Sequence, residues 1–318
     1  FENCRFESLK PSQICGNEKS QAENILFKNC TRRHLEKLKV RYNLEWNKRC
    51  GKRSRKFMNV WGPAKDVRAE NCTPSDEIKG ALVLSFDDRN FAGWEKAEPI
   101  FAKYGARATF FVSGPIDNAA VKTMKFLSER GHSVGLHGLR HADADKEIEA
   151  KGAEKYYAED ITPQADNCRV CYVPVHSFAY PDCRRTDEAD RLFYKKGFAR
   201  VRGGVKGATP FDPKGEKQTD RKPLVTNDDI FVPATELPKR RRLDTIIMGE
   251  AYHTDINEIL ACIRRAAQRR EVITITSHDI APDAKFIHMK TEWLEKMLAL
   301  AKELGLPVLG FDELPEPE

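Results

Sequence analysis

Acidic and imidazole side chains stand directly after several short apolar runs of this chain. Such runs are typical of buried strands, and in a β/α barrel the carboxyl ends of the strands carry the chemistry. In chain order, the groups at these ends are Asp87-Asp88, His137 with His141, Tyr180-Pro181-Asp182, and His278-Asp279. We therefore expect two carboxylates and three imidazoles to converge on one rim.

Three of these side chains have the types that a divalent metal needs. Two imidazoles and one carboxylate form a three-ligand set for a borderline metal such as zinc, which leaves one position for water. The metal lowers the pKa of that water to near neutrality. The second aspartate is then available as a general base and the remaining histidine as a general acid. Each feature is common by accident when taken alone, and only their joint position at strand ends favours a catalytic site.

A regular alternation of strands and helices from Lys79 onward is expected to position these groups. The expected strands are Ala81–Phe86, Ala108–Val112, Ser133–Leu136, His176–Tyr180, Ala199–Val201, Thr245–Met248, Val272–Thr276 and Val308–Phe311. The expected helices include Trp94–Tyr104, Ala119–Arg130, Thr186–Lys196, Ile256–Arg269 and Thr291–Leu304. Short strands that alternate with helices predict βαβ units and a parallel sheet. Their number favours a distorted (β/α) barrel of about seven to eight parallel strands, and Gly203–Arg242 is expected to be a long loop or insertion.

The same residues resemble the motifs of a known family, the polysaccharide deacetylases, also called the NodB-homology family or carbohydrate esterase family 4. The resemblance covers about residues 79–314. The matching stretches are Ser85-Phe86-Asp87-Asp88, His137-Gly138-Leu139-Arg140-His141 and Ile275-Thr276-Ser277-His278. The roles that the resemblance implies are general base for Asp87, metal ligand for Asp88, His137 and His141, general acid for His278, and a lining of the acetyl-methyl pocket for Ile275.

The third motif departs from the family pattern. The family usually has an Arg ahead of Pro-Tyr-Gly, whereas this chain has Phe178-Ala179-Tyr180-Pro181-Asp182-Cys183. The Arg that would orient the base is absent from its usual place, and Arg202, after the next strand, is the candidate substitute; an Arg202 that faces solvent is the alternative. Arg89 stands where a Gly commonly follows the Asp pair, and the Asp/Trp pair of the fourth motif is not recognisable. The resemblance thus implies a divergent member.

The reaction that the resemblance implies is hydrolysis of an N- or O-linked acetyl group on a carbohydrate. The implied cofactor is a divalent metal, zinc first, with cobalt, nickel or manganese as alternatives. Asp87 would take the proton of the attacking water, and His278 would protonate the leaving amine or alkoxide. A backbone N–H near Tyr180, Pro181 and Asp182 would hold the oxyanion. His253 is a further candidate for substrate contact.

Two other functions stay open. One is a glycan-binding protein that kept the metal site and lost turnover, and the other is an amide hydrolase that acts on a small nitrogen compound. The departures in the third and fourth motifs favour the binding protein. The presence of Asp87 and His278, which metal binding alone does not need, favours the enzyme.

Residues 1–77 differ in composition and hydrophobic pattern from residues 78–318, which we expect to form the deacetylase-like barrel. They are polar and contain five of the nine cysteines, and Lys28–Lys56 carries twelve Lys or Arg against two Glu. One helix is expected near Arg32–Trp46. We expect a Cys-rich basic accessory segment without catalytic residues, which packs on the barrel or forms a small disulfide-supported unit. Because the basic excess is local, no nucleic-acid partner is expected.

Composition and cysteine usage bear on class and location. Hydrophobic residues make up 40% of the 318 residues and charged residues 32%, which excludes a wholly disordered chain. No apolar run approaches the roughly 18 residues of a membrane span, and charged residues near Phe1 interrupt any stretch like a signal peptide.

Secretion or a cell-envelope location is expected from the cysteines and from sequon-like triplets at Asn29 and Asn71. Nine cysteines imply at least one thiol that is free or paired between chains. Cys168 and Cys171 are expected to form an ordinary disulfide or to be free thiols. The glycan, the disulfide pairing and the oligomeric state stay open.

Overall fold

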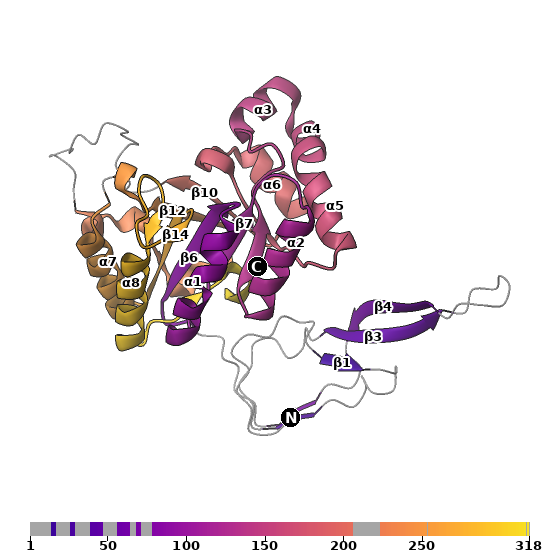
Figure 1. The fold of residues 1–318 in the computed structure, drawn as a ribbon, viewed down its shortest axis with the longest axis horizontal. Coiled ribbons are helices and arrows are strands. Elements are labelled where there is room, and N and C mark those ends of the chain that lie inside the picture. Colours follow the sequence, from indigo (N-terminus) through magenta and orange to yellow (C-terminus); the bar gives the residue numbers. More distant parts are fainter. Residues whose placement is uncertain are drawn as a thin grey trace. The chain divides into compact units, whose positions relative to one another are not determined.

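The computed structural model of this chain describes residues 78–205, 223–252, 254–315 and 317, together with the backbone of five strands in the first 77 residues. The chain divides into two compact units, residues 1–77 and residues 78–318 (Figure 1). His253, a candidate for substrate contact, lies outside the described residues.

The five strands of the first unit form two small sheets. The strands are β1 (Ile14–Gly16), β2 (Leu26–Lys28), β3 (Lys39–Trp46), β4 (Lys56–Pro63) and β5 (Arg68–Glu70). β1, β3 and β4 form one sheet, in which β3 and β4 are antiparallel, and β2 pairs with β5.

The helix expected near Arg32–Trp46 is wrong for its second half, because Lys39–Trp46 is strand β3. The sequence KVRYNLEW alternates apolar and polar residues with a period of two, which is the pattern of a strand with one polar face. Residues 32–38 of the expected helix lie outside the described residues.

The second unit is a closed barrel of seven parallel strands. The strands are β6 (Ala81–Asp88), β7 (Thr109–Val112), β8 (Ser133–Leu136), β9 (Ser177–Ala179), β10 (Arg200–Val205), β12 (Arg242–Ile247) and β13 (Glu271–Ser277). They pair in chain order, and pairing of β13 with β6 closes the barrel. Short strand β16 (Val308–Leu309) pairs with the start of β6, and β11 (Phe231–Pro233) runs antiparallel to β13. The predicted (β/α) barrel is confirmed.

Helices cover the outside of the barrel (Figure 1). They are α1 (Phe91–Tyr104), α2 (Asn118–Glu129), α3 (Ala144–Lys151), α4 (Ala153–Tyr156), α5 (Thr162–Val170), α6 (Asp187–Lys195), α7 (Ile256–Arg269) and α8 (Thr291–Glu303). Helices α2, α6 and α7 begin with side-chain caps from Asp117, Thr186 and Asp255, which satisfy backbone N–H groups that the first turn leaves open. Helices α3 to α5 are not among the helices expected from the sequence, and a π-helical turn at Tyr157–Ile161 connects α4 to α5. None of the helices in the described residues has the length and apolar character of a membrane span.

Alternation along the strands sorts side chains into two packing layers. On β6, Val83 belongs to an apolar cluster inside the barrel, whereas Leu84 belongs to the larger cluster between the sheet and the helices. On β13, Val272 is inside, whereas Ile273 and Ile275 are in the outer layer. Because side chains alternate with a period of two, every second residue before a strand end points toward the barrel axis. This parity decides which residues at the rim can meet.

Candidate active site

A cleft opens at the carboxyl ends of the barrel strands. Its volume is about 800 Å³, within the usual range for a ligand site. The lining residues that matter below are Asp87, Asp88, His137, His141, Asp182, Arg202, Ile247, Tyr252, His278 and Phe286. All four predicted strand ends therefore contribute to one cleft.

Asp87 and Asp88 reach the same imidazole although they are neighbours at the end of β6. Asp87 Oδ2 and Asp88 Oδ1 both lie 3.9 Å from His137 Nε2. An extended strand would point the two side chains to opposite faces. Asp88 departs from that geometry with a φ of +80°, and Arg89 anchors the turn by donating to the carbonyls of Ser113 and Pro115.

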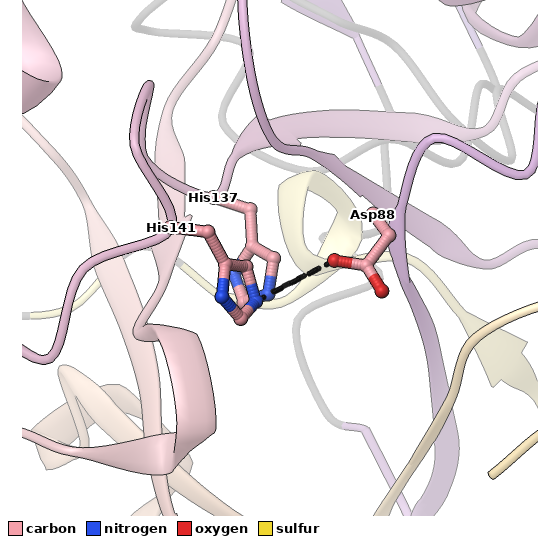
Figure 2. A group of neighbouring side chains, drawn as sticks. All are labelled: Asp88, His137 and His141. Carbon is pink, nitrogen blue, oxygen red and sulfur yellow. Dashed lines mark ion pairs between the residues drawn. The ribbon is translucent and has the colours of Figure 1, made fainter.

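Asp88, His137 and His141 form a compact set of possible metal ligands. One ligand atom from each lies within 4.8 Å of the others, and Asp88 Oδ1 is 3.5 Å from His141 Nε2. Figure 2 shows the carboxylate facing both imidazoles. The arrangement presents two nitrogens and one oxygen to a single point, which suits a divalent ion.

The ring of His137 is fixed in the orientation that a metal ligand requires. Its Nδ1 lies 2.8 Å from the carbonyl oxygen of Ala179, so Nδ1 carries the proton and Nε2 offers its lone pair to the cleft. Burial lowers the pKa of His137 to about 4, against the opposing effect of Asp87. The imidazole is therefore neutral at physiological pH.

Asp160 braces the loop that carries both histidines, and sequence reasoning missed it. Its Oδ1 accepts the backbone N–H of Arg140 at 2.7 Å, and its carbonyl accepts the N–H of Leu139 at 2.9 Å. The fully buried side chain comes from the π-helical turn Tyr157–Ile161, a type of turn that is frequent at functional sites. Gly138 is required beside it, because a Cβ there would lie 2.6 Å from Asp160 Oδ2. A hydrophobic pattern does not reveal such a contact.

Arg202 is buried and forms an ion pair with Asp87. Its Nη2 lies 2.6 Å from Asp87 Oδ2, and the two side chains are 1% and 5% exposed. Its Nη1 also donates to Thr276 Oγ1. Burial raises the pKa of Asp87, but Arg202 and the two nearby imidazoles lower it by more, so the net shift is downward. The alternative of a solvent-facing Arg202 does not hold.

The register of the sheet explains how Arg202 reaches this place. Arg202 on β10 is the direct partner of Ala179 on β9, and partners on adjacent parallel strands point to the same side of the sheet. Ala179 stands in the stretch where the family resemblance leads one to expect an Arg. Its small side chain is fully buried inside the barrel and leaves room for the guanidinium from the next strand.

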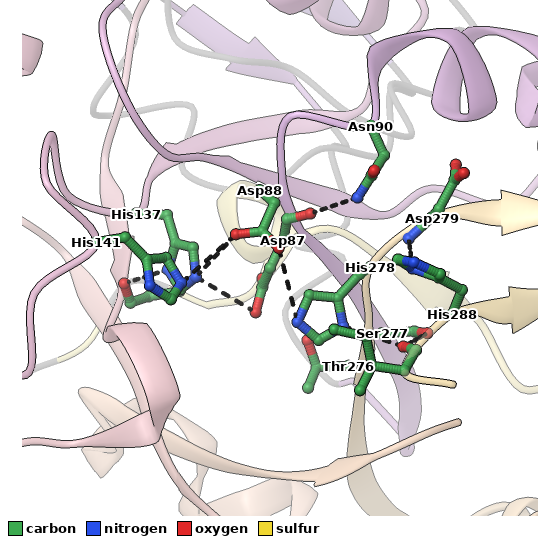
Figure 3. A network of polar contacts seen from close by, with 12 residues as sticks. Asp87, Asp88, Asn90, His137, His141, Thr276, Ser277, His278, Asp279 and His288 are labelled. Carbon is green, nitrogen blue, oxygen red and sulfur yellow. Dashed lines mark hydrogen bonds and ion pairs between the residues drawn. The ribbon is translucent and has the colours of Figure 1, made fainter. Parts of the chain in front are cut away.

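His278 lies across the cleft from the two metal-type histidines (Figure 3). Its Nδ1 is 3.1 Å from the carbonyl oxygen of Ile287, and its Nε2 is 3.9 Å from Asp88 Oδ2. The indole N–H of Trp94 donates to the His278 carbonyl at 2.8 Å. These contacts hold the ring with Nε2 toward the cleft.

The turn after β9 offers one backbone donor. The N–H of Tyr180 donates to the Arg202 carbonyl, and the N–H groups of Cys183 and Arg184 donate to carbonyls within the turn. Pro181 has no N–H, and the Tyr180 side chain is buried in the outer core. Within the described chain, the amide of Asp182 alone in this turn has no such acceptor, so the expected oxyanion donor narrows from three residues to this one.

Ile275 does not line the cleft, and the prediction that it does is wrong. It lies in the outer layer between sheet and helices and is 0% exposed. The reason is parity, since Thr276 and His278 point inward and Ile275 therefore points outward. Ile247, the strand partner of Thr276, lines the cleft instead.

Unusual backbone conformations gather at this cleft. Among the described residues, seven that are not glycine have a positive φ, and five of them line the cleft: Asp88, His141, Asp182, Cys183 and Phe286. Such conformations cost about 1–3 kcal/mol each and persist where the surrounding structure imposes them. Their concentration here favours the cleft as the candidate functional site.

Known proteins resemble the chain in the region of this site. The family model for polysaccharide deacetylases matches residues 75–201. A chitin deacetylase from Arthroderma benhamiae is 34% identical over 113 residues, which are 33% of this chain and 30% of that relative. The chain thus spans about a third of the length of this curated relative.

Solved structures of similar proteins have low sequence identity to the chain. The peptidoglycan deacetylase PdaC from Bacillus subtilis has a TM-score of 0.45 and 15% identity, and covers 75% of this chain and 91% of its own. A family 4 carbohydrate esterase from Streptomyces lividans in complex with acetate has a TM-score of 0.47, 13% identity, and coverages of 75% and 98%. A family 4 pseudoenzyme from Bacillus anthracis has a TM-score of 0.42, 14% identity, and coverages of 76% and 66%.

The family match includes the Asp pair on β6, both histidines after β8 and the turn after β9. Over residues 75–201 the barrel matches the polysaccharide deacetylase family, which is the NodB-homology family that the sequence motifs resemble. Arg202 and His278 lie beyond the matched range, and their place at the site comes from the geometry above.

Proposed function

We propose that the protein is a metal-dependent hydrolase that removes acetyl groups from a carbohydrate. The observation that carries the proposal is the meeting of three metal-type donors with a buried, ion-paired aspartate on one side and His278 on the other. The match of the barrel to the polysaccharide deacetylase model, and the similarity to a chitin deacetylase, support an acetylated glycan as substrate.

The donor set fits a divalent ion, with zinc as the first choice. Asp88, His137 and His141 would hold it, because neutral imidazole and carboxylate are its usual ligands and His137 Nδ1 is already bound to a carbonyl. When bound, such an ion lowers the pKa of a coordinated water and polarises a carbonyl oxygen.

Asp87 is the proposed general base. Its lowered pKa keeps the carboxylate ionised at neutral pH, ready to accept a proton from the attacking water. Arg202 holds Oδ2 at 2.6 Å, while Oδ1 is buried without a hydrogen-bond partner in the described chain. We assign proton transfer to this free oxygen.

His278 is the proposed general acid. Its Nδ1–H donates a hydrogen bond to the Ile287 carbonyl, which directs Nε2 toward the cleft. There Nε2 can give a proton to the departing amine or alkoxide. We assign to the Asp182 N–H the hydrogen bond to the oxyanion that forms from the acetyl carbonyl oxygen. We assign to Ile247 the contact with the acetyl methyl group.

Acetate release tests the proposal. The full chain, loaded with zinc, is incubated with acetylated chitin, peptidoglycan and xylan fragments, and released acetate is measured before and after chelation. We expect release from at least one glycan, loss after chelation and recovery when zinc is restored. Release from none of them by metal-loaded protein would favour a glycan-binding role.

A small-molecule amide hydrolase stays the second enzymatic candidate, and the volume of the cleft separates the two candidates. A cleft of about 800 Å³ is larger than a small amide would fill. The same assay with simple acetamides distinguishes them. A secreted or cell-envelope location remains part of the proposal, supported by the nature of a glycan substrate.

A further inference from the structure

Phe286 is an exposed aromatic residue at the mouth of the cleft. It is 48% exposed and lines the cleft, whereas the other large apolar residues exposed in the described chain, Val170, Tyr172 and Leu304, do not. An exposed apolar side chain at a ligand groove is more informative than one elsewhere on the surface.

The backbone holds Phe286 in place at a cost. Its φ is +62°, an uncommon conformation for a bulky residue. Its carbonyl accepts the N–H of Ala251 at 2.9 Å, and β14 (Ile280–Ala281) pairs with β15 (Met289–Lys290) to close the segment. Gly249 permits the close approach, because a Cβ there would lie 2.7 Å from the Phe286 carbonyl oxygen.

Phe286 belongs to an apolar wall on one side of the cleft. Ile247 is the last residue of β12, Tyr252 follows that strand and Ile287 follows β13, and all three line the same side of the cleft. The residues after β8 and β9 that line the cleft are mostly polar or charged, with Asp143, Lys146, Asp182 and Arg184 among them. Around the closed barrel, the pair β12 and β13 is separated from the pair β8 and β9 by β10 in one direction and by β6 and β7 in the other. The cleft therefore has an apolar wall and a polar wall.

A pyranose ring has the matching chemistry. Its faces present C–H groups, and its edges present hydroxyl groups that bond to charged and polar side chains. A small amide would reach the donors at the floor of the cleft without touching Phe286 at its mouth.

We infer that Phe286 and Tyr252 form an aromatic edge that binds the C–H face of a sugar ring next to the acetylated one. This inference rests on the proposed function and names the part of the substrate that the chain recognises: a glycan of at least two sugars. The Ile287 carbonyl, next to Phe286, also binds the Ser277 hydroxyl at 3.2 Å and His278 Nδ1 at 3.1 Å. Sugar binding at the edge therefore stabilises the segment that orients the proposed acid.

The test compares Phe286→Ala and Phe286→Tyr with wild-type protein on a monomer, a dimer and a pentamer of the glycan that is cleaved fastest. We expect Phe286→Ala to raise KM for the pentamer about 3- to 10-fold, the size of one aromatic contact, and to change KM for the monomer less. Phe286→Tyr restores the wild-type value. The matched control is Tyr172→Ala, an exposed aromatic with φ +58° that lies away from the cleft, and it leaves both constants unchanged.

Calorimetric binding of the pentamer to Asp87→Asn protein, with and without Phe286→Ala, separates this inference from the proposed function. Weaker binding with Phe286→Ala supports the edge even where no acetate is released, in which case the deacetylase proposal alone fails. Equal KM changes for all substrate lengths, no change with Phe286→Ala, or no binding of any glycan oligomer would overturn the edge.

Discussion

Arg202 gives the sharpest perturbation of the site, because it is the partner of the proposed base. Its guanidinium is 1% exposed and lies 2.6 Å from Asp87 Oδ2. Removal of one member of such a buried pair costs about 3–5 kcal/mol, since the remaining charge is left without compensation. Domains of this size have about 5–15 kcal/mol of stability in total, so Arg202→Ala is expected to fold with a clearly lowered melting temperature.

The effect on activity follows from geometry. Arg202→Lys keeps a positive charge but loses the fork that joins Asp87 to Thr276 and Ser85, because an ammonium cannot bond bidentately. A displacement of the base by about 1 Å costs roughly 100-fold. We therefore expect kcat for acetate release to fall about 10- to 100-fold in Arg202→Lys, with metal content unchanged.

A compensating change tests the register argument directly. Ala179 and Arg202 are strand partners that point to the same side of the sheet. The double variant Ala179→Arg with Arg202→Ala moves the guanidinium to the neighbouring strand, and we expect it to regain at least about tenfold of the kcat lost in Arg202→Ala. The assays are acetate release and thermal unfolding. If Arg202→Ala keeps kcat within threefold of wild type, the proposed orienting role is wrong.

Three further predictions concern stability, metal binding and the acetyl pocket. Asp160→Ala leaves the Arg140 N–H without its acceptor, so we expect a loss of about 1–3 kcal/mol in unfolding free energy and roughly 10- to 100-fold weaker zinc binding by calorimetry. Asp160→Asn keeps the acceptor and should restore most of the stability and of the zinc affinity. Equal zinc affinity in wild type and both variants would contradict the bracing role. The pKa of His137 is about 4 in the folded protein, and that of a histidine in the unfolded chain is about 6.5. The contribution of His137 to the free energy of unfolding is therefore fully present above pH 6.5 and is lost as the pH falls toward 4. Metal-free protein should lose roughly 2 kcal/mol between pH 7 and 5 through this residue, and denaturant titrations should show a smaller loss in His137→Asn; an equal loss would refute it. Ile247→Ala should raise KM for acetylated substrate. Ile275→Ala, in the outer core, should cost about 2–5 kcal/mol of stability and leave KM unchanged. The opposite pattern in kinetics and unfolding would reject the assignment of the acetyl pocket to Ile247.

The barrel could be predicted from the sequence because its strands are short apolar runs with buried faces on both sides. The expected Ser133–Leu136 and Ile256–Arg269 agree with β8 and α7 at both ends. Polar segments were harder. Helices α3 to α5 contain many charged residues and little apolar periodicity. The helix expected near Arg32–Trp46 overlaps β3, whose apolar residues alternate with a period of two.

The residue types of the candidate site could be predicted from the sequence, but the directions in which its side chains point could be predicted less well. Parity along β13 already places Ile275 opposite His278, so the family resemblance misled where the period of two was sufficient. The ion pair of Arg202 with Asp87 depends on the register between β9 and β10, and the turn at Asp88 depends on a φ of +80°. Neither quantity follows from local sequence, because both are set by packing between distant segments.

The measurement that tests the central claim most directly compares Asp87→Asn with Asp88→Asn. Zinc content is measured by elemental analysis and turnover by acetate release, on protein whose folding is verified by thermal unfolding. We predict that Asp87→Asn keeps its metal and loses about two to four orders of magnitude in kcat, the usual contribution of a general base, whereas Asp88→Asn loses the metal. Loss of metal in Asp87→Asn with retention in Asp88→Asn would reverse the two roles, and unchanged acetate release in both variants would contradict the deacetylase mechanism itself.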